Sequence, residues 1–341
     1  MQTQFLKADE QSLQIGAELI KAGQVVGFPT ETVYGLGADA LNSEAVHAIF
    51  AAKCRPADNP LIVHISDWSE IEPLCHVNEM SRRLADAFWP GPLTMILPRK
   101  DIIPDVVTAG LDSVAIRMPS HPIARQLIRL SGCPIAAPSA NRSGRPSPTT
   151  AAHVLEDMDG RVPLILDGGP CSVGVESTVV SLTGDMAVVL RPGGVTPEMI
   201  AAVLGDCKIA DSIMRPLKEG EAAPSPGMKH KHYAPRARMT LYEGEEQAVE
   251  ERICHEYDST SAEEKPLILT CDAHIAAYGD RRCYNLGADA AAAARNLFAA
   301  LRYADEESIT RIYSESYSQS GVGLAVMNRM ARAAGFDMVN V

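Results

Sequence analysis

Short apolar runs alternate with amphipathic segments along the first 205 residues. Residues 12–22 place their apolar positions on one helical face, and Gly23 follows them. Similar patterns predict helices at 44–53, 79–88, 123–130 and 196–205. Apolar runs between them predict strands at 25–28, 61–65, 93–97, 114–118, 134–137, 164–166, 178–182 and 188–190. This alternation predicts a strand-rich α/β domain over residues 1–205.

The pattern stops at residue 206 and resumes at residue 238. Residues 206–237 contain prolines, glycines and charges with little periodicity, which predicts a linker. A connection of about 30 residues is too long to be idle in a compact protein. Beyond it, strands are predicted at 239–242, 267–269 and 309–313, with helices at 288–303 and 323–334. These predict a smaller parallel α/β domain over residues 238–341.

Composition and charge narrow the possible functions. The 341 residues are 46% hydrophobic and carry a net charge of −12, without a visible basic stripe. Tight binding to a nucleic-acid duplex usually needs such a stripe. No apolar run approaches the ~20 residues of a membrane span, and the first residues lack the pattern of a secretion signal. We therefore expect a cytoplasmic protein without membrane association.

The sequence offers no standard metal or nucleotide motif. None of the eight cysteines lies in a C-x-x-C pair or near a spaced histidine pair, so we expect no zinc or redox site. The chain has neither a P-loop nor a G-x-G-x-x-G fingerprint. Any nucleotide would therefore bind through another architecture, and Mg²⁺ would arrive with its phosphates.

The loop 138–148 is the first candidate site. It follows the apolar run 134–137 and contains three serines, one asparagine and two arginines among its prolines. Ser, Asn and Pro also dominate ordinary turns. Hydroxyls, an amide and cations at the end of a strand nevertheless favour a site for a phosphate-bearing ligand.

Four other polar residues lie near apolar segments. Lys53 and Arg55 follow a predicted helix, where they either complement its carboxyl end or grip a triphosphate. His64 lies in an apolar strand, as structural core histidines commonly do. Arg117 also lies in an apolar strand and needs an anionic partner. That partner is either a ligand carboxylate or a structural acid, and the sequence leaves both open.

Ten motifs in one order resemble the Sua5/YrdC/YciO family, in its long Sua5 form. They cover nearly the whole chain and occupy residues 28–37, 53–56, 59–64, 89–94, 114–117, 137–141, 145–149, 174–178, 190–193 and 226–235. The resemblance implies a YrdC-like domain with a twisted mixed sheet and a concave active-site cleft. It also implies a Rossmann-like parallel C-terminal domain, and a linker 206–237 that folds over the active site.

The resemblance also implies a reaction. L-threonine, bicarbonate and ATP, the last as Mg-ATP, give L-threonylcarbamoyl-AMP and pyrophosphate. A separate transferase complex then modifies adenosine 37 of tRNAs that read ANN codons. Binding of tRNA by this chain itself is expected to be weak or absent.

The resemblance also implies a role for individual residues of this sequence. The catalytic set is Lys53, Arg55, Ser139 and Asn141. L-threonine would meet Thr32, His64, Arg117, Ala137 and Ser177. ATP would meet Arg55, Asn59, Ser113, Ser139, Ser147, Arg191 and His230.

Two other functions remain open at this point. Short relatives of the family have been viewed as RNA-binding modules, although the net charge of −12 argues against tight tRNA binding. A related domain occurs in carbamoyl-transfer enzymes that mature hydrogenases. Those enzymes carry acylphosphatase and zinc-finger-like modules, which this sequence does not show.

Overall fold

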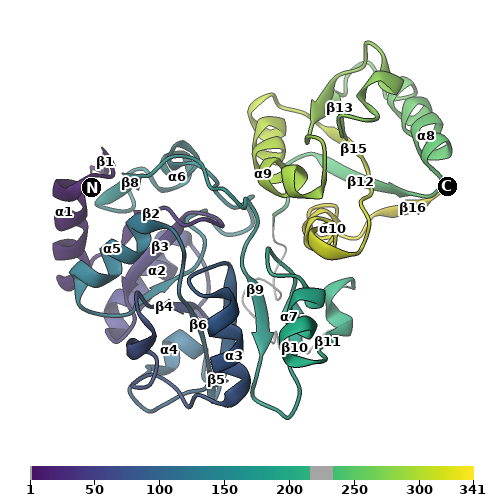
Figure 1. Cartoon of the computed structure of the whole chain (residues 1–341). Helices are drawn as coiled ribbons and strands as arrows, with labels where there is room; N and C mark the ends of the chain where they lie inside the picture. Colours follow the sequence, from purple (N-terminus) through teal and green to yellow (C-terminus); the bar gives the residue numbers. More distant parts are fainter. Residues whose placement is uncertain (1, 216–232) are drawn as a thin grey trace. The chain divides into compact units, whose positions relative to one another are not determined.

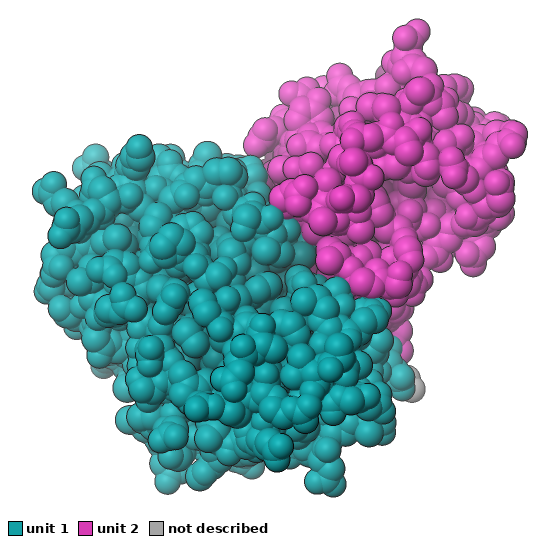
Figure 2. All heavy atoms as spheres, viewed as in Figure 1, with its two compact units in different colours: residues 1–143, 147–213, 217–229 teal, residues 144–146, 214–216, 230–341 magenta. Residues whose placement is uncertain are grey.

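The computed structural model describes residues 2–215 and 233–341, which form two compact units (Figure 2). The described part of unit 1 is residues 2–143 and 147–213, and that of unit 2 is residues 144–146, 214–215 and 233–341. His230 and most of the predicted linker 206–237 lie outside the described residues. None of the described helices is long and apolar enough to cross a membrane.

Unit 1 is built on one mixed sheet of eleven strands (Figure 1). Their order is β1-β8-β2-β3-β7-β4-β6-β5-β9-β10-β11. The strands are β1 (Gln4–Lys7), β2 (Val26–Phe28), β3 (Gly35–Asp39), β4 (Ile62–His64), β5 (Leu93–Pro98), β6 (Ser113–Arg117), β7 (Ile135–Ala137), β8 (Leu164–Asp167), β9 (Thr178–Ser181), β10 (Val188–Arg191) and β11 (Lys208–Ile209). Parallel and antiparallel pairs both occur, so the predicted mixed sheet is confirmed.

Seven α-helices accompany this sheet in the described part of unit 1. They are α1 (Glu10–Lys21), α2 (Ser43–Lys53), α3 (Glu79–Phe88), α4 (Asp105–Thr108), α5 (Pro122–Ser131), α6 (Ala151–Met158) and α7 (Pro197–Leu204). Helix α1 begins with a capping box in which the Asp9 carboxylate accepts from the Ser12 amide (2.8 Å). α1 and α5 pack together and bury an apolar core against β2, β7 and β8.

The structure adds elements that the sequence pattern does not reveal. In unit 1 the strands β1, β3 and β11 and the helices α4 and α6 had no prediction. In β3, a Cβ on Gly37 would come within 2.7 Å of both Ile135 and Phe28. Large neighbours thus require glycine in this strand, although glycine is uncommon in strands. The strand β11 extends the sheet of unit 1 past residue 205, into the segment predicted as linker.

Unit 2 contains a five-stranded sheet in the order β14-β13-β15-β12-β16, and all its pairs are parallel. The strands are β12 (Arg238–Glu243), β13 (Pro266–Thr270), β14 (Cys283–Asn285), β15 (Arg311–Glu315) and β16 (Met338–Asn340). Helix α8 (Glu246–Asp258) packs against the sheet, and α9 (Ala290–Glu306) packs on α10 (Gly321–Ala333). In Figure 1 the strands lie between α8 and the pair α9 and α10. The predicted parallel α/β domain is confirmed.

Candidate functional site

Three neighbouring strands place polar side chains in one row. His64 at the end of β4 lies opposite Arg117 at the end of β6, and Arg117 lies opposite Thr94 in β5. Directly opposed residues share a face of the sheet. Ala137 lies opposite Ile62, so it belongs to the same face. An apolar cluster of Ile62, Ile96, Ala115 and Val179 forms the adjacent part of that face.

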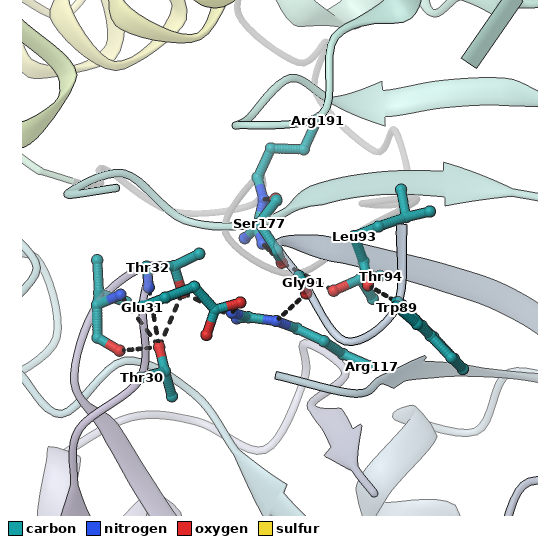
Figure 3. Close-up of polar contacts among 11 residues, drawn as sticks. Thr30, Glu31, Thr32, Trp89, Gly91, Leu93, Thr94, Arg117, Ser177 and Arg191 are labelled. Atoms are coloured by element: carbon teal, nitrogen blue, oxygen red, sulfur yellow. Dashed lines mark hydrogen bonds and ion pairs between the residues drawn. The ribbon is translucent and has the colours of Figure 1, made fainter. Parts of the chain in front are cut away.

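Arg117 is buried and held from three sides. Its Nη2 lies 2.6 Å from Glu31 Oε1, its Nη1 donates to Thr32 Oγ1 (2.8 Å), and its Nε donates to the Gly91 carbonyl (3.3 Å). Figure 3 shows the Glu31 and Arg117 side chains extending toward each other from different strands and loops. The structural acid that the sequence left open is therefore Glu31. A guanidinium has five N–H donors, so two are still available for a ligand carboxylate.

Glu31 is the residue that sequence reasoning missed. Its side chain is 6% exposed, and neither oxygen accepts a well-aligned hydrogen bond from the described residues. Burial raises the pKa of this carboxyl, but the charge of Arg117 and polar contacts with Arg117 and nearby backbone amides together outweigh burial and hold the pKa below its usual range. Glu31 is thus an anion in the site, beside the cation of Arg117. The only available signal was its place in the motif 28–37.

The other titratable groups near this pair are uncharged. Burial, reinforced by the charge of Arg117, lowers the pKa of His64 to about 3. Burial likewise lowers the pKa of His121. Burial also raises the pKa of the Cys171 thiol to about 12, so that thiol stays protonated. A neutral His64 offers one ring nitrogen as donor and the other as acceptor; Nδ1 lies 3.1 Å from the Ile62 carbonyl.

Ser177 and Arg191 form a second group beside this row. The Ser177 hydroxyl lies 2.7 Å from Thr94 Oγ1 and accepts from Arg191 Nη2 (3.1 Å), while Arg191 Nε donates to the Ser177 carbonyl (3.1 Å). Gly193 makes this approach possible, because a Cβ there would lie 2.3 Å from the Thr178 nitrogen. The structure therefore brings Thr32, His64, Arg117, Ala137, Ser177 and Arg191 to one region of unit 1.

Lys53 supports the loop 138–148. Its buried ammonium donates to the carbonyls of Asn141 (2.6 Å) and Ser139. The Ser139 hydroxyl in turn donates to Asn141 Oδ1 (2.5 Å). Sequence reasoning treated Lys53 as a cation facing phosphate, whereas here it also fixes the backbone that carries Ser139 and Asn141.

The residues expected to meet ATP are spread more widely. Arg55 Nη2 donates to the Asn59 carbonyl (3.0 Å), and Ser147 donates to the Glu176 carboxylate. The side-chain amide of Asn59 is fully buried, and neither its oxygen nor its nitrogen has a hydrogen-bond partner among the described residues. A buried amide without partners requires an explanation, and a ligand would supply one.

Asn59 and Ser113 lie at the opposite end of the strand pair from His64 and Arg117. Ser113 begins β6, and Arg117 ends it. Four residues of strand span about 13 Å. Of the expected ATP residues, Asn59 and Ser113 thus lie away from the expected threonine residues, whereas Arg191 contacts Ser177.

The neutral His64 predicts a specific dependence of stability on pH. An unfolded histidine binds a proton near pH 6.5, but folded His64 does so only near pH 3. The unfolded state therefore binds more protons between these values, and stability falls as the pH decreases through this window. His64→Gln should reduce the slope of unfolding free energy between pH 6.5 and 5 by up to about 1.4 kcal/mol per pH unit.

Urea unfolding at closely spaced pH values measures this slope. His121 should preserve part of it in the variant, because its pKa is lowered too. The same change at His76, whose side chain is exposed, serves as the control. An unchanged slope in His64→Gln would contradict the buried neutral state.

Two family models match the chain. Residues 18–193 match a model named for Sua5, YciO and YrdC and described as telomere recombination. Residues 195–335 match a model described as the C-terminal domain of threonylcarbamoyl-AMP synthase. The two matches meet between residues 193 and 195, after the last residue of the site in unit 1.

Relatives match over almost the full length. A threonylcarbamoyl-AMP synthase of Pyrococcus abyssi is 46% identical over 336 residues, covering 98% of this chain and 97% of that protein. One from Bacillus subtilis is 47% identical over 342 residues, covering 98% and 96%. A crystal structure of P. abyssi Sua5 complexed with L-threonine is similar with a TM-score of 0.92 and 44% identity, covering 100% of this chain and 99% of that one. The chain therefore belongs to the Sua5/YrdC/YciO family, in the two-domain form that carries the threonylcarbamoyl-AMP synthase C-terminal domain.

Proposed function

We propose that this protein is a threonylcarbamoyl-AMP synthase. It would condense L-threonine, bicarbonate and ATP to L-threonylcarbamoyl-AMP and pyrophosphate. The observation that carries the proposal is the buried pair of Glu31 and Arg117, in a row with His64 and beside Thr32 and Ser177. A relative with this fold is described as complexed with L-threonine.

The opposite charges of Arg117 and Glu31 match the carboxylate and ammonium groups of an amino acid. Arg117 has two donors left for the carboxylate of threonine, and Glu31 lacks aligned donors that an ammonium group would supply. Thr32 and Ser177 add hydroxyls at the same place, and Ala137 leaves space beside them. Neutral His64 contributes hydrogen bonding without adding charge.

ATP would lie along the remaining part of the site. Arg55 and Arg191 supply cations, and Asn59, Ser113, Ser139 and Ser147 supply hydrogen bonds. Asn59 supports this assignment most directly, because its amide is buried without partners among the described residues. ATP would enter as Mg-ATP, with the metal as part of the substrate. His230, in the segment not described, stays a predicted ATP contact, and the linker 206–237 stays a predicted cover.

In the proposed reaction two anions, the carbamate and the triphosphate of ATP, must come into contact. Carboxylation of the threonine amine by bicarbonate gives a carbamate and releases water, and a carbamate oxygen then attacks the α-phosphorus while pyrophosphate leaves. Positive charge and fixed geometry lower the cost of this approach. Lys53 fixes the backbone of the loop 138–148, so Ser139 and Asn141 are positioned before the substrates bind. Arg55 and Arg191 are the cations that would face the phosphates.

Release of pyrophosphate tests the proposed activity. The full chain should release it only when ATP, L-threonine and bicarbonate are all present. Omission of any one should abolish the signal, and mass spectrometry should identify L-threonylcarbamoyl-AMP. Release of pyrophosphate without bicarbonate would indicate another adenylation reaction. A separate transferase is proposed to use the product on adenosine 37 of ANN-decoding tRNAs in the cytoplasm.

Arg117→Lys tests the carboxylate contact. Lysine keeps a positive charge opposite Glu31 but loses the planar fork that binds a carboxylate through two donors. We expect the KM for L-threonine to rise about 10- to 100-fold, as for loss of a charge-assisted hydrogen bond. The KM for ATP should change little.

Arg125→Lys is the matched control, because Arg125 lies on α5 and donates to the Ser66 carbonyl (3.1 Å). It should leave both KM values near those of the parent. If Arg117→Lys leaves the KM for L-threonine unchanged, Arg117 does not bind that carboxylate.

L-serine should be a poor but measurable substrate. It keeps the hydroxyl, amine and carboxylate of threonine and lacks only one methyl group. One methyl group in a pocket changes binding by ~1–3 kcal/mol, or about 10- to 200-fold in kcat/KM. Steady-state comparison of the two amino acids measures this ratio. Complete exclusion of serine would show that more than methyl packing controls selectivity.

A further inference from the structure

Unit 2 contains a polar cluster where two neighbouring parallel strands end. Thr270 is the last residue of β13, and Glu315 is the last residue of β15. The chain leaves β13 toward β14 at one edge of the sheet and leaves β15 toward β16 at the other edge. In open α/β sheets, ligands bind beyond the carboxyl ends of strands at such a change of direction.

Glu315 is buried and its two oxygens have different surroundings. Oε1 accepts hydrogen bonds from Thr270 Oγ1 (2.8 Å) and Tyr278 Oη (2.6 Å). Oε2 faces His274 Nδ1 at 2.8 Å. The hydroxyls of Thr270 and Tyr278 thus fix the orientation of the Glu315 carboxylate through Oε1. The second oxygen, Oε2, lies next to the His274 imidazole.

Cys271 brings a third donor atom to this place. One ligand atom each from Cys271, His274 and Glu315 lies within 4.8 Å of the other two. The cysteine is free, and the spacing Cys-x-x-His places it one turn before the histidine. We propose that Cys271, His274 and Glu315 form a binding site for a zinc-like divalent ion, with thiolate, imidazole and carboxylate as ligands.

The distance between the histidine and glutamate ligand atoms fits such an ion with a small adjustment. Two ligands at about 2.0–2.1 Å from a tetrahedral zinc ion lie about 3.3 Å apart. Nδ1 and Oε2 lie 2.8 Å apart, so they would separate by about 0.5 Å as the proton between them leaves. A sulfur, nitrogen and oxygen donor set is typical for Zn²⁺ and Co²⁺ and disfavours Mg²⁺ or Ca²⁺.

Groups around the three ligands support the assignment. A histidine that binds a metal through one nitrogen usually donates the other N–H to a carboxylate. His274 Nε2 lies 3.3 Å from Glu246 Oε1 at the beginning of α8. Together with Thr270 and Tyr278 on Glu315, this arrangement provides the outer contacts that orient metal ligands.

Tyr317 follows Glu315 by two residues and carries a further polar group of this region. Its hydroxyl is buried and has no hydrogen-bond partner in the described ranges 2–215 and 233–341. A water molecule on the ion would give this hydroxyl a partner and complete a four-coordinate site.

The alternative is a network of hydrogen bonds without metal. Thr270, Tyr278, His274 and Glu315 already satisfy one another. That network does not use the Cys271 thiol, whereas the metal site requires it as a thiolate. The thiol therefore distinguishes the two explanations.

Cobalt substitution of the full chain tests the site. After chelator treatment, addition of Co²⁺ should produce a near-ultraviolet charge-transfer band from thiolate to metal, and Zn²⁺ should remove it by competition. Cys271→Ser should abolish the band, and His274→Gln should weaken Zn²⁺ binding at least about 10-fold. Glu246→Gln should weaken Zn²⁺ binding about 10-fold and retain the band, because it changes only an outer contact.

Cys207→Ser is the matched control, since Cys207 is a half-buried free thiol in unit 1. It should leave the band and the affinity unchanged, and circular dichroism should confirm that every variant folds. Histidines elsewhere can bind Co²⁺ but give no thiolate band. Absence of the band in the parent, or its persistence in Cys271→Ser, would overturn the proposal in favour of the hydrogen-bond network.

Discussion

The buried ion pair between Glu31 and Arg117 is the contact on which the candidate site depends. Removing either partner would leave an uncompensated charge in the interior, which is strongly unfavourable. The pair joins the motif 28–37 to the end of β6. Burial is the main reason that His64 is neutral, and the charge of Arg117 lowers its pKa further while Glu31 opposes this effect. The proposed threonine site and its local electrostatics thus depend on one contact.

The sheet fixes the relative positions of the polar residues in this row. Register places His64, Arg117 and Thr94 in one row, so the distances between them follow from strand spacing rather than from flexible loops. The loop 138–148 is not part of the sheet, and Lys53 fixes it by donating to two of its carbonyls. The row on the sheet and the loop held by Lys53 together form a fixed framework for the candidate site.

The residues of the two candidate sites are distributed differently along the sequence. In unit 1 the polar residues of the site occur in ordered motifs, and a family resemblance identifies most of them. In unit 2 the residues around Glu315 come from β13, β15, α8 and the turn after β13. A search for C-x-x-C pairs and paired histidines does not find Cys271 and His274. The third proposed ligand, Glu315, is 41 residues from His274 in the sequence. Parallel strands bring that partner into place.

The sequence by itself determined the α/β fold class with a mixed and a parallel sheet, and most of the helices and strands. Periodic burial is a local property, so it can be read from the order of residues. It did not determine β3, whose glycines are needed only because Phe28 and Ile135 occupy the adjacent space. Nor did it determine whether Arg117 pairs with a ligand or with the protein, or that Lys53 holds a loop 86 residues away. Those choices depend on contacts between distant segments, and only the tertiary structure decides them.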